Sequence, residues 1–136
     1  MKIGAHVSIS GGPASGIDRA VEIGAETIQI FASSPRSWRF KPLLEDQVLV
    51  FRERVEATSV KPAFIHGSYL VNVGGDPEML EKSIALLVAN LEAAGQIGAV
   101  GVIFHGGSHK GKGFDAILDQ AASALRQVLV KCPPGV

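Results

Sequence analysis

Two short apolar runs decide the fold: Pro62-Ala63-Phe64-Ile65-His66 and Gly101-Val102-Ile103-Phe104-His105. The residues between them show apolar side chains at steps of three and four, which fall on one face of a helix: Leu80, Ile84, Leu87, Val88 and Leu91. A strand, a helix and a second strand joined by short connections predict parallel strands and a right-handed crossover. We therefore expect a βα unit here, followed by the strand of the next unit.

The same alternation continues on both sides of this segment. Further strands are predicted at Lys2–Val7 and Thr27–Ala32, and they are also almost wholly apolar, which is typical of strands covered on both faces. Three more helix faces are predicted. They comprise Ile17, Ala20, Val21 and Gly24; then Leu44, Val48, Phe51 and Val55; then Phe114, Ile117, Leu118, Ala121, Leu125 and Val128.

Helix boundaries are marked by local signals. Asp76-Pro77-Glu78 provides a capping side chain, a first-turn proline and an acidic first turn. Gly24 and Gly98 stand where the first and third helices should end, each between an isoleucine and an alanine. The sequence thus predicts four successive βα units.

Four such units fit an open doubly wound sheet or a closed barrel. No glycine-rich phosphate-binding pattern follows the first strand, which favours an α/β fold of the βα-barrel (TIM) type. A complete barrel needs about 250 residues. We expect the 136 residues to form a single domain, 1–136, containing only the first four units, and residues 131–136 to lead toward a fifth strand as in a truncated barrel.

Composition limits the possible partners and environment. With 13 basic and 13 acidic residues, the formal net charge is zero, so any polyanion would be bound by a local patch rather than by bulk charge. Cys132 is the only cysteine, which excludes an intrachain disulfide and favours a reducing compartment. The apolar stretch 83–104 is interrupted by polar residues and predicts no membrane span. We expect a cytoplasmic protein.

Three histidines occupy equivalent positions in the repeat. His6, His66 and His105 each close a predicted strand and are followed by small residues. In a βα-barrel the carboxyl ends of the strands converge on one mouth, so these imidazoles should lie close together. Two imidazoles from adjacent strands can begin a metal site without completing it. A single histidine at such a place is more often a partly buried, backbone-bonded residue, and it is the threefold coincidence that favours a site.

Two loops and one further histidine are also candidates for function. Residues 33–41 interleave three cations with two aromatics, and Tyr69-Leu70 lies just beyond His66; basic groups suit phosphates, and apolar wedges can enter a base stack. Alternatively, Trp38 and Phe40 pack against the second helix while the arginines face water. His109 could support a metal ligand, contact a phosphate or simply lie in a solvated loop; we favour the last two.

Taken together, these motifs resemble the endonuclease IV family in order and spacing over essentially the whole chain. The matching segments are Gly4-Ala5-His6-Val7-Ser8, Arg36-Ser37-Trp38, His66-Gly67-Ser68-Tyr69-Leu70-Val71-Asn72 and Phe104-His105-Gly106-Gly107-Ser108-His109. One local departure is Gly106, where many members have proline.

The resemblance implies a βα-barrel enzyme with three zinc ions that cleaves duplex DNA on the 5′ side of abasic sites. His66 and His105 would be ligands of one zinc, and Arg36, Tyr69 and Leu70 would enter the minor groove. His6 would lie near the site without being a ligand. The family's bridging glutamate is expected just after Val136 and its other ligands later still, so we expect this chain alone to be inactive. No protein partner is implied.

Two other functions remain open. A sugar isomerase or epimerase on the same type of barrel also uses histidines and carboxylates around a divalent metal, but it has no need of an exposed basic loop or a Tyr-Leu wedge. A non-catalytic half-barrel is the second alternative. Its outer strands, Lys2–Val7 and Gly101–His105, would have exposed edges and would be prone to self-association.

Overall fold

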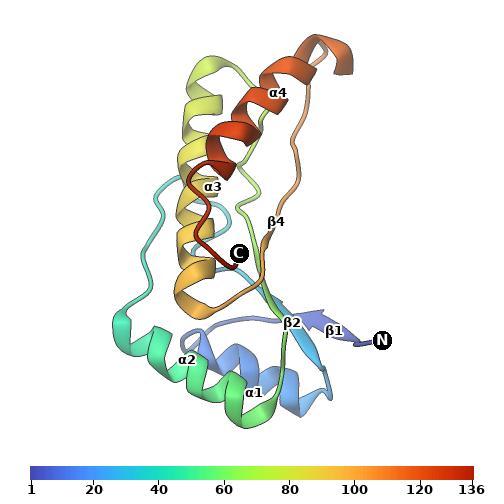
Figure 1. Ribbon diagram of the computed structural model, residues 1–136. Coiled ribbons are helices and arrows are strands. Elements are labelled where there is room, and N and C mark those ends of the chain that lie inside the picture. The colour runs from blue at the N-terminus through green and yellow to red at the C-terminus, as the bar shows by residue number, and fades with distance from the viewer.

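The computed structural model describes residues 1–136 and contains one parallel sheet with four strands in the order β1-β2-β3-β4 (Figure 1). The strands are β1 (Gly4–His6), β2 (Thr27–Ile30), β3 (Ala63–His66) and β4 (Val102–Ile103). They alternate with the helices α1 (Ala14–Glu22), α2 (Glu45–Thr58), α3 (Pro77–Ile97) and α4 (Phe114–Leu129). Four βα units in chain order are therefore confirmed.

The predicted helix signals are confirmed in detail. The Asp76 carboxylate accepts a hydrogen bond from the Met79 backbone N–H at 2.8 Å, and Pro77 opens α3. Gly24 and Gly98 both have φ of 72°, where the absence of a Cβ lets the chain turn out of α1 and α3. The two helix ends also share a backbone hydrogen-bond pattern, because the N–H groups of Ala25 and Ala99 each donate to the carbonyl five residues earlier.

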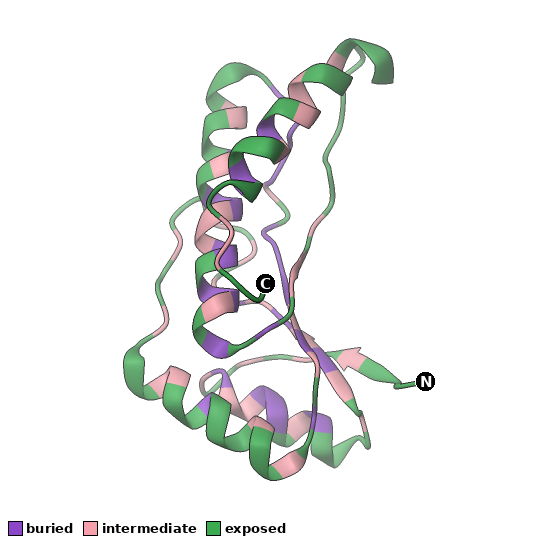
Figure 2. Ribbon diagram, viewed as in Figure 1, coloured by how far each residue is buried: buried purple, intermediate pink, exposed green.

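The helices cover one face of the sheet, and the core lies between them and the strands (Figure 2). Ile28 and Ile30 of β2 point to this side and pack with Ile17 of α1 and Phe51 of α2, all four nearly or fully buried. A second cluster lies between α3 and α4 and includes Leu87 and Val128. Truncating Phe51 to alanine should cost about 3–5 kcal/mol, because it is the largest fully buried side chain.

The opposite face of the sheet has no helix over it. The apolar runs predict strands covered on both faces, but residues of β1 and β2 on this face are polar. His6 pairs in register with Gln29, and the two side chains are hydrogen-bonded there. The strands are also shorter than predicted. In particular, β4 ends at Ile103, so His105 lies two residues beyond it rather than closing it.

Some predicted helix faces are wrong at individual positions. Val21 of α1 is 50% exposed, and Phe114 and Leu118 of α4 are 64% and 47% exposed. These residues lie on the two terminal helices, which have a neighbouring helix on one side only. Leu44 is also exposed, because it is the residue before α2 rather than part of its buried face.

None of the helices is both long enough and apolar enough to span a lipid bilayer. This includes α3, which has 21 residues and contains most of the longest apolar stretch of the sequence.

Candidate metal centre

Three imidazoles gather at the carboxyl ends of the strands, as the repeat predicts. The ring of His66 lies 5.6 Å from that of His6 and 5.3 Å from that of His105, measured between centroids. The register of the sheet explains why the two rings meet. His66 pairs with Ile103, and His105, two residues after Ile103, therefore reaches the same rim as His66. His66 is therefore the central member of the cluster.

The hydrogen bonds of His66 leave one ring nitrogen free to bind a metal. Its Nδ1 lies 2.7 Å from the carbonyl oxygen of Gly67, and since a carbonyl only accepts, Nδ1 carries the proton. In the neutral ring Nε2 then has an unshared electron pair. This is the usual arrangement of a metal-ligating histidine, whose other nitrogen donates to a carbonyl.

The two imidazoles of His66 and His105 fit part of a zinc site. The donors are of the type that zinc prefers, but zinc in proteins usually takes three or four protein ligands. No group of three or more His, Cys, Asp and Glu side chains in the chain is arranged to hold a metal ion. This chain offers two ligands and no third.

His6 has a different environment from the other two rings. Its Nδ1 accepts a hydrogen bond from the Gln29 side-chain amide at 2.9 Å, which leaves the proton of the neutral ring on Nε2. Burial lowers the pKa of His6 below the usual 6.5, and the nearby His66 lowers it further, because two protonated rings would repel each other. His6 is therefore held as a neutral N–H donor at the rim.

His109 stands apart from the cluster. Its Nδ1 accepts hydrogen bonds from the backbone N–H groups of Gly111 and Gly113, both at 3.1 Å. These bonds close the glycine-rich turn before α4, and the ring is exposed. Of the three roles considered for His109, this geometry corresponds to a loop residue.

The residues predicted to contact DNA lie along the same rim. Tyr69 is 55% exposed, and its ring meets His66 at 5.6 Å and Phe31 at 5.3 Å, both edge to face. Leu70 is half-buried and Arg36 is exposed. In the same loop as Arg36, Phe40 packs against both core clusters, whereas Trp38 remains 37% exposed. Of the two aromatic residues only Phe40 packs as the alternative requires, whereas both arginines of the loop, Arg36 and Arg39, are exposed as it requires.

Hydrogen bonds tie the loops after β2, β3 and β4 into a continuous rim. The Pro35 carbonyl accepts from the Ser68 hydroxyl at 2.8 Å and from the Tyr69 N–H at 3.0 Å. The buried Asn72 side-chain oxygen accepts from the N–H groups of Gly74 and Ser108, both at 3.0 Å. The first pair joins the β2 and β3 loops, and Asn72 joins the β3 and β4 loops.

Sequence reasoning missed several of these residues. Asn72 was noted only as part of a motif. Its position two residues before Gly74 was the available signal for its structural role, since asparagine side chains often bond the backbone two residues further along the chain. Phe31 was also missed, although its ring lies 4.5 Å from His6 and 5.1 Å from His66. Phe31 directly follows β2 and thus takes, in the second unit, the rim position that histidines hold elsewhere.

Comparison with known proteins supports the barrel fold. Residues 17–134 match the family described as xylose isomerase-like TIM barrel. Endonuclease 4 of Thermus thermophilus is 41% identical over 135 residues, which are 98% of this chain and 49% of that protein. A crystal structure of endonuclease IV from Thermus thermophilus superposes with a TM-score of 0.80 at 40% identity, over 94% of this chain and 47% of that one. The chain belongs to the endonuclease IV family.

This endonuclease IV family chain spans about half the length of the curated relatives it matches. The predicted barrel fold is confirmed for the four units present. The 3-keto-D-glucoside 4-epimerase of E. coli superposes with a TM-score of 0.64 at 18% identity, over 96% of this chain and 52% of that one. That likeness shows the fold alone, and it is the fold shared with the sugar-isomerase alternative.

Proposed function

We propose that the complete protein is a zinc-dependent endonuclease that cleaves duplex DNA on the 5′ side of abasic sites, leaving a 3′-hydroxyl. The observation that supports this most directly is the meeting of His66 and His105 at the carboxyl rim, beside the exposed ring of Tyr69. Catalytic residues of βα-barrels lie at this rim. The 41% identity with endonuclease 4 supports the same reaction.

In this proposal His66 and His105 hold one of three zinc ions, and the remaining ligands are not among these residues. When bound, zinc polarises a phosphoryl oxygen and lowers the pKa of water to near neutrality, which supplies the nucleophile. The bond from His66 Nδ1 to the Gly67 carbonyl would fix the ring and leave its Nε2 unprotonated and available to the metal. No nucleophilic side chain is required from this chain.

The rim residues Arg36, Tyr69 and Leu70 recognise the lesion. All three enter the minor groove and help to expel the abasic nucleotide. The Pro35 carbonyl accepts a hydrogen bond from the Tyr69 backbone N–H, so the loop that carries Tyr69 and Leu70 is fixed to the loop after β2. Wedges of this kind are unnecessary for a small sugar substrate, which favours the nuclease over an isomerase or epimerase.

Incision of a duplex containing one tetrahydrofuran abasic analogue tests the proposal. The complete protein with zinc should cut once, 5′ to the analogue. His66→Asn and His105→Asn should each lose at least about tenfold in rate, whereas His109→Asn, outside the cluster, should retain most activity. Turnover of ketoses without incision would instead assign the isomerase function.

The 136-residue chain alone should not cut the same duplex, even with added zinc, because two imidazoles bind zinc weakly. Metal-dependent incision by this chain at a rate comparable with that of the complete protein would contradict the proposed ligand set.

A further inference from the structure

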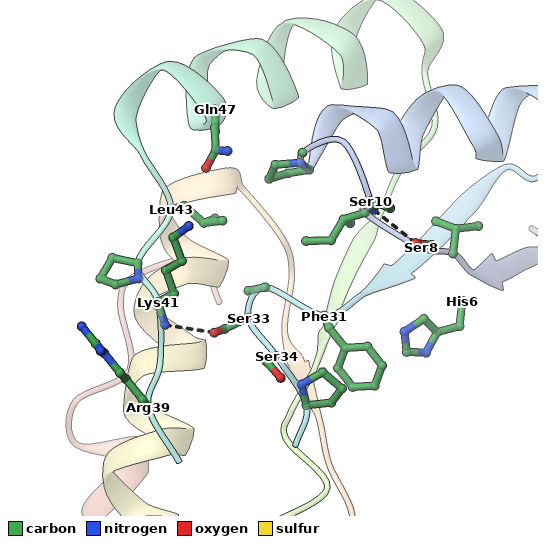
Figure 3. A pocket seen from close by; sticks show the side chains of 17 residues that line it. His6, Ser8, Ser10, Phe31, Ser33, Ser34, Arg39, Lys41, Leu43 and Gln47 are labelled. Carbon is green, nitrogen blue, oxygen red and sulfur yellow. Dashed lines mark hydrogen bonds between the residues drawn. The ribbon is translucent and has the colours of Figure 1, made fainter. Parts of the chain in front are cut away.

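The ring of Phe31, which directly follows β2, stands at the carboxyl rim between side chains of the first and third units. Figure 3 shows it beside His6, where both line a groove of about 670 Å³ between the loops that follow β1 and β2. The Phe31 ring centroid lies 4.5 Å from that of His6, 5.1 Å from that of His66 and 5.3 Å from that of Tyr69. These distances fall in the range of about 4.5–7 Å that aromatic pairs prefer, so Phe31 contacts three rings at once.

The rings of Phe31, His66 and Tyr69 form a closed triangle. The pairs of Phe31 with His66 and with Tyr69 are both edge to face, with interplanar angles of 63° and 73°. The third side, from His66 to Tyr69, measures 5.6 Å. Edge-to-face packing depends on direction, because the positive edge of one ring meets the negative face of another. Each ring of the triangle therefore limits the orientation of the other two.

Hydrogen bonds alone leave both partners of Phe31 incompletely fixed. The bond from His66 Nδ1 to the Gly67 carbonyl fixes one atom of the imidazole, but it does not by itself set the plane of the ring. Tyr69 is held through its backbone N–H, and its 55% exposed side chain forms aromatic pairs only with Phe31 and His66. The orientation of both side chains therefore depends on packing against Phe31.

The Phe31 ring can act only by packing. It has no nitrogen or oxygen, so it can neither bind a metal nor donate a hydrogen bond, unlike the histidines at the neighbouring rim positions. It is half-buried, with one side against the rings of His66 and Tyr69 and part of its surface open to the groove.

We propose that Phe31 is a positioning residue that holds the plane of the His66 ring and the direction of the Tyr69 ring together. Phe31 itself contacts neither metal nor DNA. A shift of either ring is opposed through Phe31, so the metal ligand and the wedge are coupled. The roles of His66 and Tyr69 as ligand and wedge rest on the proposed function, whereas the ring triangle does not.

Zinc affinity and base unstacking test this role separately from incision. Competition with a chromophoric chelator measures zinc binding to the complete protein. The fluorescence of a 2-aminopurine opposite a tetrahydrofuran abasic analogue, recorded before incision, reports insertion of the wedge. Phe31→Leu keeps an apolar side chain without the ring, and it should weaken at least one zinc about tenfold and reduce the fluorescence rise several-fold. Phe31→Tyr keeps the ring and should retain most of both.

Phe51→Leu is the matched control. Phe51 is fully buried in the core between α1, α2 and the sheet, away from the rim. This variant should lower the urea midpoint more than Phe31→Leu does, because it leaves a cavity in a fully buried site. Its zinc affinity and fluorescence rise should nevertheless stay near those of the wild type.

A Phe31→Leu variant in which either readout is unchanged would overturn the proposal. Equal losses in Phe31→Tyr and Phe31→Leu would also overturn it, as would losses in Phe31→Leu and Phe51→Leu that follow their urea midpoints, since volume or stability would then explain them. If Phe31→Leu reduces both readouts while the wild type with zinc fails to incise the duplex, the role of Phe31 stands and the proposed nuclease function falls.

Discussion

The side-chain oxygen of Asn72 accepts a hydrogen bond from the backbone N–H of Ser108 at 3.0 Å, across 36 positions of sequence. The same oxygen accepts from the Gly74 N–H, and the Asn72 N–H donates to the Ser83 hydroxyl of α3 at 2.9 Å. The loop that follows His66 is thereby attached both to α3 and to the loop that follows His105.

Asn72→Ala should destabilise the protein by at least about 2 kcal/mol, because two backbone donors lose their acceptor at a site where Asn72 is only 6% exposed. Urea unfolding measures the loss. Gln96→Ala, an exposed polar position on α3, serves as the control and should change the free energy of unfolding by less than about 0.5 kcal/mol. Equal stabilities of the two variants would refute this role of Asn72.

Gly107 should not tolerate a side chain. It has φ of 91°, and a Cβ added there would lie 2.3 Å from the Asn72 side-chain oxygen. Gly107→Ala should therefore cost about 2 kcal/mol or more through backbone strain and displacement of Asn72. Gly106→Ala is the matched control, since a Cβ at the adjacent position meets nothing within 4 Å. Thermal unfolding of both variants gives the comparison, and the prediction fails if Gly106→Ala is the more damaging change.

The pKa of His6 should lie below 6.5 in the folded, metal-free chain, because burial and the neighbouring His66 both oppose its protonation. The unfolded chain binds this proton more readily, so the contribution of His6 lowers stability as pH falls below about 6.5 and has no effect above it. An NMR titration should give a low pKa for His6 that rises in His66→Asn. A value at or above 6.5 in the wild type would contradict the arrangement.

Self-association of the 136-residue chain is also predicted. β1 and β4 are the edges of the sheet, and exposed apolar side chains lie near both, such as Ile3 and Ile103. Unpaired strand edges with apolar neighbours favour pairing between chains. Light scattering should show dimers or larger species at micromolar concentration, and a stable monomer over that range would exclude the prediction.

Local signals explain how much of the fold the sequence predicted. The cap at Asp76, the exits at Gly24 and Gly98 and the apolar periodicities act within a few residues, so they identified every helix and strand. The meeting of His66 and His105 followed from one topological rule, that the carboxyl ends of parallel strands share a rim. Strand ends were less accurate, because the stagger between neighbouring strands decides where pairing stops.

The contacts that were missed depend on pairs far apart in sequence. The bond from Gln29 to His6, the packing of Phe31 against three aromatic rings and the reach of Asn72 to Ser108 cannot be read from periodicity. Each of these joins neighbouring loops or strands, so it requires the register of the sheet. The outward positions of Val21 and Phe114 were missed for a related reason, since their exposure depends on which helices have neighbours.

Zinc anomalous diffraction from crystals of the complete protein tests the central claim most directly. We expect a peak about 2.0–2.1 Å from Nε2 of His66 and from a ring nitrogen of His105, with His66 Nδ1 still bonded to the Gly67 carbonyl. Fully bound zinc located elsewhere, with the rings of His66 and His105 free of metal, would contradict the account.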